Sequence, residues 1–262
     1  MDPALHTAAS GMRAQQTRVE VISHNLANVS TTAFKRSRAH FEDLLYQTVQ
    51  SGTTVDGAGA STTPEIQIGR GTRLAGVQRV DVQGPLEQTG RPLDFAIEGD
   101  GFFQVQLPDG SLAYTRDGSF TISDQGMLVT GSGYAVVPSV AVPADATGLS
   151  VSRNGVVTVS APGATESIEV ARLELARFAN APGLKALGEN LYQETQASGT
   201  AQVGFPQEQG FGRIVQGSLE ASNVEIVQEM VEMITAMRAY EINSKAVQSA
   251  EQMAETANNL IR

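Results

Sequence analysis

The chain has 262 residues and a formal net charge of −10, with 41% hydrophobic residues but only 5% aromatic residues and no Trp. This length is enough to bury a core, and the acidic charge argues against nucleic acid as a partner, because binding phosphates requires clustered Lys and Arg. The sequence holds no Cys, which excludes disulfides, zinc–thiolate sites, iron–sulfur clusters and thiol catalysis. The start Met1-Asp2-Pro3 lacks the basic and apolar regions of a secretory signal, and no run approaches 20 apolar residues, so we expect neither a cleaved signal peptide nor a membrane span.

The first segment, residues 1–32, predicts an amphipathic helix. Its apolar positions follow one another at intervals of three and four residues, with the small Ala8 and the polar Gln15 completing the series. These apolar positions are Leu5, Met12, Val19, Ile22 and Leu26. Such spacing is typical of a coiled-coil seam. The polar cluster that begins at Asn25 competes for backbone hydrogen bonds and is expected to end the helix.

Residues 33–75 are predicted to form a linker or an extended arm. A low-complexity stretch of Gly, Ser, Thr and Ala runs through residues 51–63, and this composition is typical of a loop. A basic cluster, Lys-Arg-Ser-Arg, stands at residues 35–38, with acidic residues at 42 and 43. The mixed charges favour a solvated, paired surface, and the alternative is a contact with a neighbouring subunit or with peptidoglycan.

Residues 76–218 predict an antiparallel β domain. Asp-Gly and Asn-Gly turn signals recur at short intervals, as at Asp109-Gly110, Asp117-Gly118 and Asn154-Gly155. Runs that alternate apolar and polar residues lie between these turns, for example Phe103–Leu107. Alternation is expected where one face of a strand is buried, so these runs are assigned to strands.

The last segment, residues 219–262, predicts a second and longer helix. Ser222-Asn223 offers an N-cap, with Glu225 three residues after Ser222, and neither Gly nor Pro follows before the end of the sequence. Its apolar positions, at steps of three, four and seven residues, are Met230, Met233, Met237, Tyr240, Val247, Ala254 and Ile261. Polar members of the same seam, such as Ser244 and Glu251, favour a surface shared among several copies, and the alternative is an ordinary helix pair within one chain.

The predicted order of helix, arm, β domain and helix belongs to the α+β class. Two helices with narrow apolar seams bury little by themselves, so they are expected to pack on each other or on neighbouring molecules. Because the helices bracket the sheet in the sequence, we expect the N- and C-terminal helices to form a coiled-coil-like stalk. The central antiparallel β domain and the extended arm would project from this stalk.

The sequence offers little for catalysis. All three histidines, His6, His24 and His40, lie in the first 40 residues, and no serine stands in a nucleophile motif. No phosphate-binding or metal-binding motif is present, so we expect no cofactor and no metal. A glycan hydrolase would require two carboxylates in a cleft, for which Glu98 with Asp100 or Asp117 can be nominated. Acidic residues beside Gly are explained more simply by tight turns, so we expect the chain not to be an enzyme.

The N-terminal region resembles the rod and hook proteins of the bacterial flagellum. Two stretches carry this resemblance, Ala8–Gln16 and Asn25–Lys35, and together they are similar to the N-terminal signature of the family. The signature positions are Gly11, Met12, Asn25, Ala27, Asn28, Phe34 and Lys35. The family usually carries Gly where Ala33 stands.

Later stretches extend the resemblance over nearly the whole chain. Ile97–Val105 and Tyr114–Phe120 are similar to the central β module of the family, and Gln216–Val224 with Ala239–Glu241 is similar to its C-terminal segment. Within the family, the stretch Phe34–Gln47 and the length of the chain are most similar to the distal rod members.

The resemblance implies a structural subunit of the flagellar distal rod, with a proximal rod or hook subunit as the alternative. Copies would polymerise through both helical seams into a rigid helical tube that encloses the export channel and transmits motor torque to the hook. The implied partners are further copies of the chain, proximal rod subunits below, hook or junction subunits above, the surrounding bushing rings and the flagellar export apparatus. The implied location is the basal-body rod in the periplasm, reached through the flagellar secretion channel. The stretch 47–64 would distinguish a straight rod from a bendable hook.

Overall fold

The computed structural model describes residues 3–50, 66–143, 146, 148–160, 168–208 and 210–260. The chain forms two compact units, of which unit 1 comprises residues 1–27, 37–79 and 225–262, and unit 2 comprises residues 28–36 and 80–224. Helices stand at both ends and antiparallel strands lie between them, which confirms the predicted α+β class.

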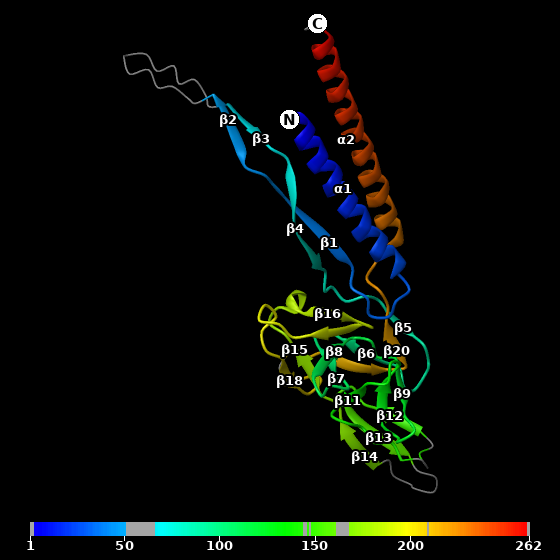
Figure 1. Cartoon of the computed structure of the whole chain (residues 1–262). Coiled ribbons are helices and arrows are strands. Elements are labelled where there is room, and N and C mark those ends of the chain that lie inside the picture. The colour runs from blue at the N-terminus through cyan, green and yellow to red at the C-terminus, as the bar shows by residue number, and fades with distance from the viewer. Residues whose placement is uncertain are drawn as a thin grey trace, which may run out of the picture. The chain divides into compact units, whose positions relative to one another are not determined.

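Two long helices form one part of unit 1. Helix α1 spans Pro3–Ala27 and helix α2 spans Ile226–Leu260. They lie side by side and run antiparallel (Figure 1), since Asn25 contacts Glu229 near one end and Gly11 faces Asn243 further along. Within the described residues, neither helix is apolar enough over a sufficient length to cross a bilayer.

The other part of unit 1 is a pair of β ribbons. Strand β1 (Ser37–Asp43) pairs antiparallel with β4 (Thr72–Arg79), and β2 (Tyr46–Gln50) pairs antiparallel with β3 (Ile66–Gly69). These strands were not predicted from the sequence, because most of their residues are exposed and the alternation in β3, Ile66-Gln67-Ile68, is short. The low-complexity residues 51–63 lie outside the described part of the chain.

Unit 2 is built from short antiparallel strands and one 3-10 helix. Their bounds are β5 (Leu86–Gln88), β6 (Phe95–Glu98), β7 (Phe102–Gln106), β8 (Leu112–Thr115), β9 (Phe120–Ile122), β10 (Leu128–Thr130), β11 (Ala135–Val137), β12 (Gly148–Val151), β13 (Val156–Ser160), β14 (Ile168–Arg172), β15 (Leu175–Arg177), η1 (Ala181–Gly183), β16 (Lys185–Gly188), β17 (Leu191–Gln193), β18 (Gln202–Gly204), β19 (Arg213–Gln216) and β20 (Ser218–Glu220). The largest sheet has the order β16-β17-β8-β7-β11-β10-β9, with β15 pairing with both β7 and β18. Smaller sheets join β12, β13 and β14, β6 with β19, and β5 with β20.

Strand β7 separates two buried clusters in unit 2. On one side Phe103 packs edge-on against Phe120, with ring centroids 5.2 Å apart, in the main core. On the other side Phe102 joins Tyr114 and Phe178 in a second cluster. The alternating pattern of Phe103–Leu107 indicated a strand with one buried face, but Gln104 is also buried because the second cluster covers that side.

Candidate assembly site

The two helices of unit 1 approach closely at a signature glycine. A Cβ atom added to Gly11 would lie 2.9 Å from Nδ2 of Asn243, closer than normal packing allows. One and a half to two turns further along α1, a guanidinium N–H of Arg18 donates to Glu232 at 3.3 Å. The small residue at position 11 therefore leaves room for the Asn243 side chain of α2.

A second signature residue, Asn25, ties three elements of unit 1 together. Its amide Nδ2 donates to Glu229 of α2 at 3.1 Å and to the Ser37 carbonyl at 2.9 Å. Its Oδ1 accepts a hydrogen bond from the Ser37 N–H at 2.8 Å. The polar cluster that begins at Asn25 was expected to end the helix, and α1 ends within it, at Ala27. The Asn25 side chain itself bonds β1 and α2 and not its own backbone.

The signature residue Lys35 lies in a buried ionic cluster of unit 2. Its ammonium donates to Oε1 of Glu220 and to the Val82 carbonyl, the latter at 2.9 Å, and the Lys35 and Glu220 side chains are 3% and 0% exposed. The Gly84 N–H also donates to Glu220, at 2.9 Å, and Nε of Arg116 lies 3.4 Å from the other carboxylate oxygen. A solvated basic surface was the wrong interpretation for Lys35, because its partner is supplied from 185 residues away.

Charge balance in this cluster makes the carboxylate indispensable. Burial lowers the pKa of Lys35 below its ordinary value, and the nearby carboxylate of Glu220 acts in the opposite direction. Two cations, Lys35 and Arg116, share this one buried carboxylate. Removing it would leave both cations without their buried counterion.

The side chain of Asn223 joins two segments of unit 2, and its predicted role as a helix cap was wrong. Ser222-Asn223 was expected to cap the last helix, but α2 begins at Ile226. The Asn223 amide instead donates to the carbonyls of Val80 and Val82, both at 2.9 Å, and its Oδ1 accepts from the Arg36 N–H at 2.7 Å. Its side chain is therefore used to join two other segments of unit 2 rather than to satisfy the start of a helix.

Ala33 adopts the backbone conformation that favours glycine. Its φ angle is +57°, its side chain is buried, and its N–H donates to the Glu220 carbonyl at 2.7 Å. A non-glycine residue in the left-handed region is strained. This geometry explains why a glycine suits the position.

The remaining signature residues occupy α1 and the turn that follows it. Met12 is half-buried, and Ala27 is the exposed last residue of α1. The Asn28 carbonyl accepts from the Thr31 N–H at 3.1 Å, and the Phe34 carbonyl accepts from the Asn223 N–H at 3.3 Å.

The predicted seam residues are distributed over more than one surface. On α1, Ile22 is buried, while Leu5, Met12, Val19 and Leu26 are half-buried. On α2, Met233 and Val247 are half-buried, whereas Met230, Met237 and Tyr240 are 43–50% exposed. Ile261 and the side chain of Ala254 lie outside the described residues.

Helix α2 thus carries apolar side chains on two faces. Ala236 and Ala250 are buried on one face, together with the polar Glu229. At about 100° per residue, a second set of side chains, 47–77% exposed, points the other way. We call this set the outer patch: Ile226, Val227, Met230, Val231, Ile234 and Met237. Val227, Val231 and Ile234 were not predicted from the sequence as part of an apolar surface, although their spacing of three and four residues indicates one.

The carboxylates nominated for catalysis make structural contacts. Glu98 forms two hydrogen bonds of 2.8 Å with Arg213. Asp117 accepts from the Ser119 N–H at 3.0 Å and from Asn190 at 3.2 Å. Asp100 lines a shallow hollow together with Glu98.

All three histidines are exposed, and the described residues hold no group of three His, Asp or Glu suited to a metal.

Comparisons with known proteins match the chain in three regions. Residues 5–35 match the family model for flagella basal body rod proteins, residues 96–159 match the D1 domain of flagellar hook protein FlgE/F/G, and residues 215–260 match the C-terminal region of flagellar basal body rod FlgEFG proteins.

Relatives align with the chain over almost its full length. The flagellar basal-body rod protein FlgG of Borreliella burgdorferi is 48% identical over 261 residues, covering 99% of this chain and 98% of that protein. FlgG of Caulobacter vibrioides is 46% identical over 258 residues, covering 98% of each chain. The flagellar basal-body rod protein FlgF of the same organism is 34% identical over 261 residues, covering 98% of this chain and 97% of that protein.

Proposed function

Since the chain belongs to the family of flagellar basal-body rod proteins, we propose that it is a structural subunit of the flagellar distal rod. The observation that carries this proposal is the 46–48% identity, over 98–99% of the chain, to proteins named FlgG. Identity to the rod protein FlgF is lower, at 34%. This difference favours the rod position of the FlgG proteins over that of FlgF.

Unit 1 supplies the surfaces for polymerisation in this proposal. The half-buried side of α1 and the outer patch of α2 leave apolar side chains uncovered in the single chain. Contiguous exposed apolar surface is typical of protein–protein contacts. The seam residues that the single chain leaves exposed or half-buried would be covered by neighbouring copies in the assembled rod.

The proposal assigns different tasks to the segments of the chain. Residues 1–32 and 219–262 would form the inner helical layers, residues 33–75 would brace adjacent subunits, and residues 76–218 would form the outer wall. The stretch 47–64 would help to keep the rod straight. Torque would pass as shear across many subunit contacts, so the stiffness of the rod would depend on how completely these contacts are packed.

The chain would act without catalysis, as one element of a larger machine. It would leave the cytoplasm through the flagellar export apparatus and assemble in the periplasm. Proximal rod subunits would lie below it, hook or junction subunits above it, and bushing rings around it. The structural pairing of Glu98 with Arg213 supports a role in folding for the carboxylate that a hydrolase would require.

Electron microscopy of basal bodies tests the proposal. Basal bodies would be isolated from a strain that lacks the gene and from the same strain carrying a restored copy. We expect rods that stop short of the distal segment and carry no hook in the first strain only. Complete rods that lack only the hook would indicate a hook subunit, and intact basal bodies would contradict the proposal.

A further inference from the structure

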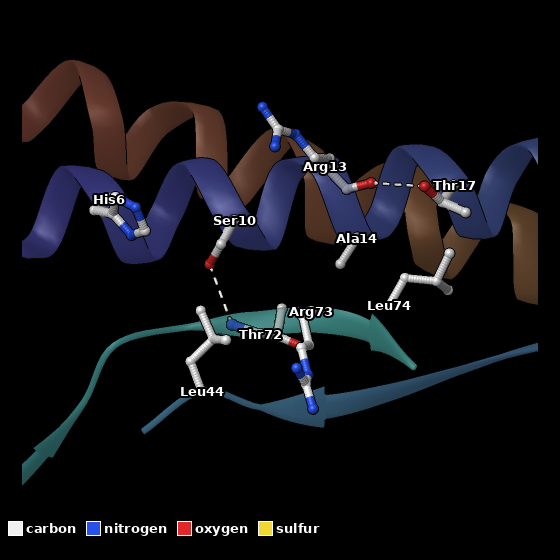
Figure 2. Close-up of a pocket in the computed structure, with 9 residues that line it drawn as sticks. All are labelled: His6, Ser10, Arg13, Ala14, Thr17, Leu44, Thr72, Arg73 and Leu74. Carbon is white, nitrogen blue, oxygen red and sulfur yellow. Dashed lines mark hydrogen bonds between the residues drawn. The ribbon is translucent and has the colours of Figure 1, made fainter. Parts of the chain in front are cut away.

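An apolar groove lies in unit 1 between α1 and the β1–β4 ribbon. It has a volume of about 420 Å³, and Ala14, Leu44 and Leu74 contribute its apolar lining. Figure 2 shows Ala14 directed from α1 toward the strands, while Leu44 and Leu74 project from the opposite side. Leu74 is 43% exposed and Leu44 is half-buried, whereas Ala14 is buried, so the single chain leaves the ribbon side of this lining partly uncovered.

The groove is a built feature of unit 1. Oγ of Ser10 accepts a hydrogen bond from the Thr72 N–H at 3.2 Å (Figure 2). The same hydroxyl donates to the Thr7 carbonyl at 2.7 Å. A Cβ atom on Gly71 would lie 2.2 Å from this Ser10 oxygen, so the glycine permits the ribbon to approach the helix. The contact fixes the distance between α1 and the ribbon at a point within the groove, between His6 and Arg13.

Unit 1 also presents the surface that would fit this groove. The outer patch consists of six apolar side chains within Ile226–Met237, and the exposed Arg238 follows it directly in the sequence. It therefore extends over about three turns, or about 16 Å at 1.5 Å per residue. The α1 residues that line the groove run from His6 to Thr17, which is the same number of helical steps.

We propose that the outer patch of one copy docks into the α1–ribbon groove of a second copy. This inference rests on the proposed rod function and names the pair of surfaces that would join neighbouring subunits. The two surfaces differ, so every copy can receive one neighbour and insert into another. A contact of this heterologous kind builds an open helical polymer unless its rotation closes a ring.

The charges of the two helices agree with this pairing. Helix α1 carries two Arg and one Glu, whereas α2 carries five Glu against one Arg and one Lys. Arg13 and Arg73 lie at the borders of the groove, and Arg73 pairs with Glu42 at 3.0 Å. Arg18 already pairs with Glu232 of the same chain, so Arg13 is the α1 cation left beside the groove. The remaining net acidic charge of α2 favours contact with Arg13 over contact between two copies of α2.

Photo-crosslinking tests the pairing in assembled rods. A benzophenone amino acid would replace Ile234, which is 52% exposed in the outer patch, in a strain where this chain is the only copy. Isolated basal bodies would be irradiated, and crosslinked peptides would be identified by mass spectrometry. We expect adducts between two copies that join residue 234 to residues 6–17 or 72–74. The same probe at Ile168, which is 60% exposed on β14, should give no adducts there.

A reciprocal probe covers the case in which substitution of Ile234 itself prevents assembly. A probe at Leu74 should capture residues 226–237 of a second copy. If rods contain the chain but both probes capture only other segments, or give no intermolecular adduct, the pairing is overturned while the rod function stands. If isolated rods do not contain the chain, the proposed function fails as well.

Discussion

The two compact units differ in how completely they cover their own apolar side chains. In unit 2, Phe103, Phe120 and Leu175 are fully buried, and all three belong to the same hydrophobic core. In unit 1, the six side chains of the outer patch on α2 are 47–77% exposed. Unit 2 therefore obtains its packing from one chain, whereas unit 1 leaves apolar surface available for other molecules. The difference indicates that stability and assembly depend on separate parts of the sequence.

A charge in the outer patch should have the largest effect, on assembly alone. We expect Met237→Asp to abolish rod formation and motility, because docking would bury an unpaired carboxylate. Met237 is 48% exposed in the single chain, so the free energy of unfolding should change by less than about 0.5 kcal/mol. Electron microscopy of basal bodies and urea denaturation followed by circular dichroism measure the two effects.

The matched control for this variant is Ile168→Asp. Ile168 is 60% exposed on β14 of unit 2, outside the proposed contact. This control should form normal rods. Normal rods from Met237→Asp, or unfolding of the purified variant, would contradict the assignment of Met237 to the assembly surface.

Val19→Asp on α1 is likewise expected to block rod formation while leaving unit 2 folded.

Loss of the buried carboxylate should have the largest effect on stability. We expect Glu220→Gln to lower the free energy of unfolding by about 3–5 kcal/mol, because Lys35 and Arg116 lose their shared anion. Denaturant unfolding of the purified chain measures this change. The control Glu208→Gln breaks a surface pair with Arg172 and should cost less than about 1 kcal/mol. Equal effects of the two variants would show that burial of the cluster contributes nothing.

Adding a methyl group at Gly118, where two backbone segments lie close together, should lower the free energy of unfolding by an intermediate amount. A Cβ atom at Gly118 would lie 1.6 Å from the Phe95 carbonyl oxygen, so Gly118→Ala should cost about 1–3 kcal/mol as β6 is displaced. The control is Gly131→Ala, where no atom lies within 4 Å of the added Cβ. Thermal unfolding of both variants compares them. A stable Gly118→Ala variant would mean that unit 2 is packed less tightly than its buried core indicates.

The smallest effect is expected at the strained residue Ala33. Ala33→Gly relieves a φ of +57°, but it also removes a buried methyl group and adds freedom to the unfolded chain. These contributions should nearly cancel, with a gain of at most about 0.5 kcal/mol. Ala113→Gly, at a fully buried strand position without this strain, should be about 1–2 kcal/mol less stable than Ala33→Gly. Equal losses in the two variants would exclude backbone strain at position 33.

Local patterns in the sequence were sufficient for the main elements of the fold. Periodicity of three and four residues located both terminal helices, and turn signals such as Asn154-Gly155 located the antiparallel strands between them. The signature pointed to Gly11, Asn25 and Lys35, although not to what these residues contact. Each of these signals depends on residues close together in the chain, which is why they are readable from the sequence.

Other features were decided only by the tertiary structure. Lys35 pairs with the carboxylate of Glu220, 185 residues further along the chain. Strand β1 pairs with β4 although a low-complexity stretch, which predicted a loop, separates the two in the sequence. The sequence shows that α2 is rich in apolar residues, but which of them α1 covers depends on how the two helices pack. Periodicity reports the geometry of one element, whereas burial and ion pairing depend on which distant elements meet, and that choice is made by the packing of the whole unit.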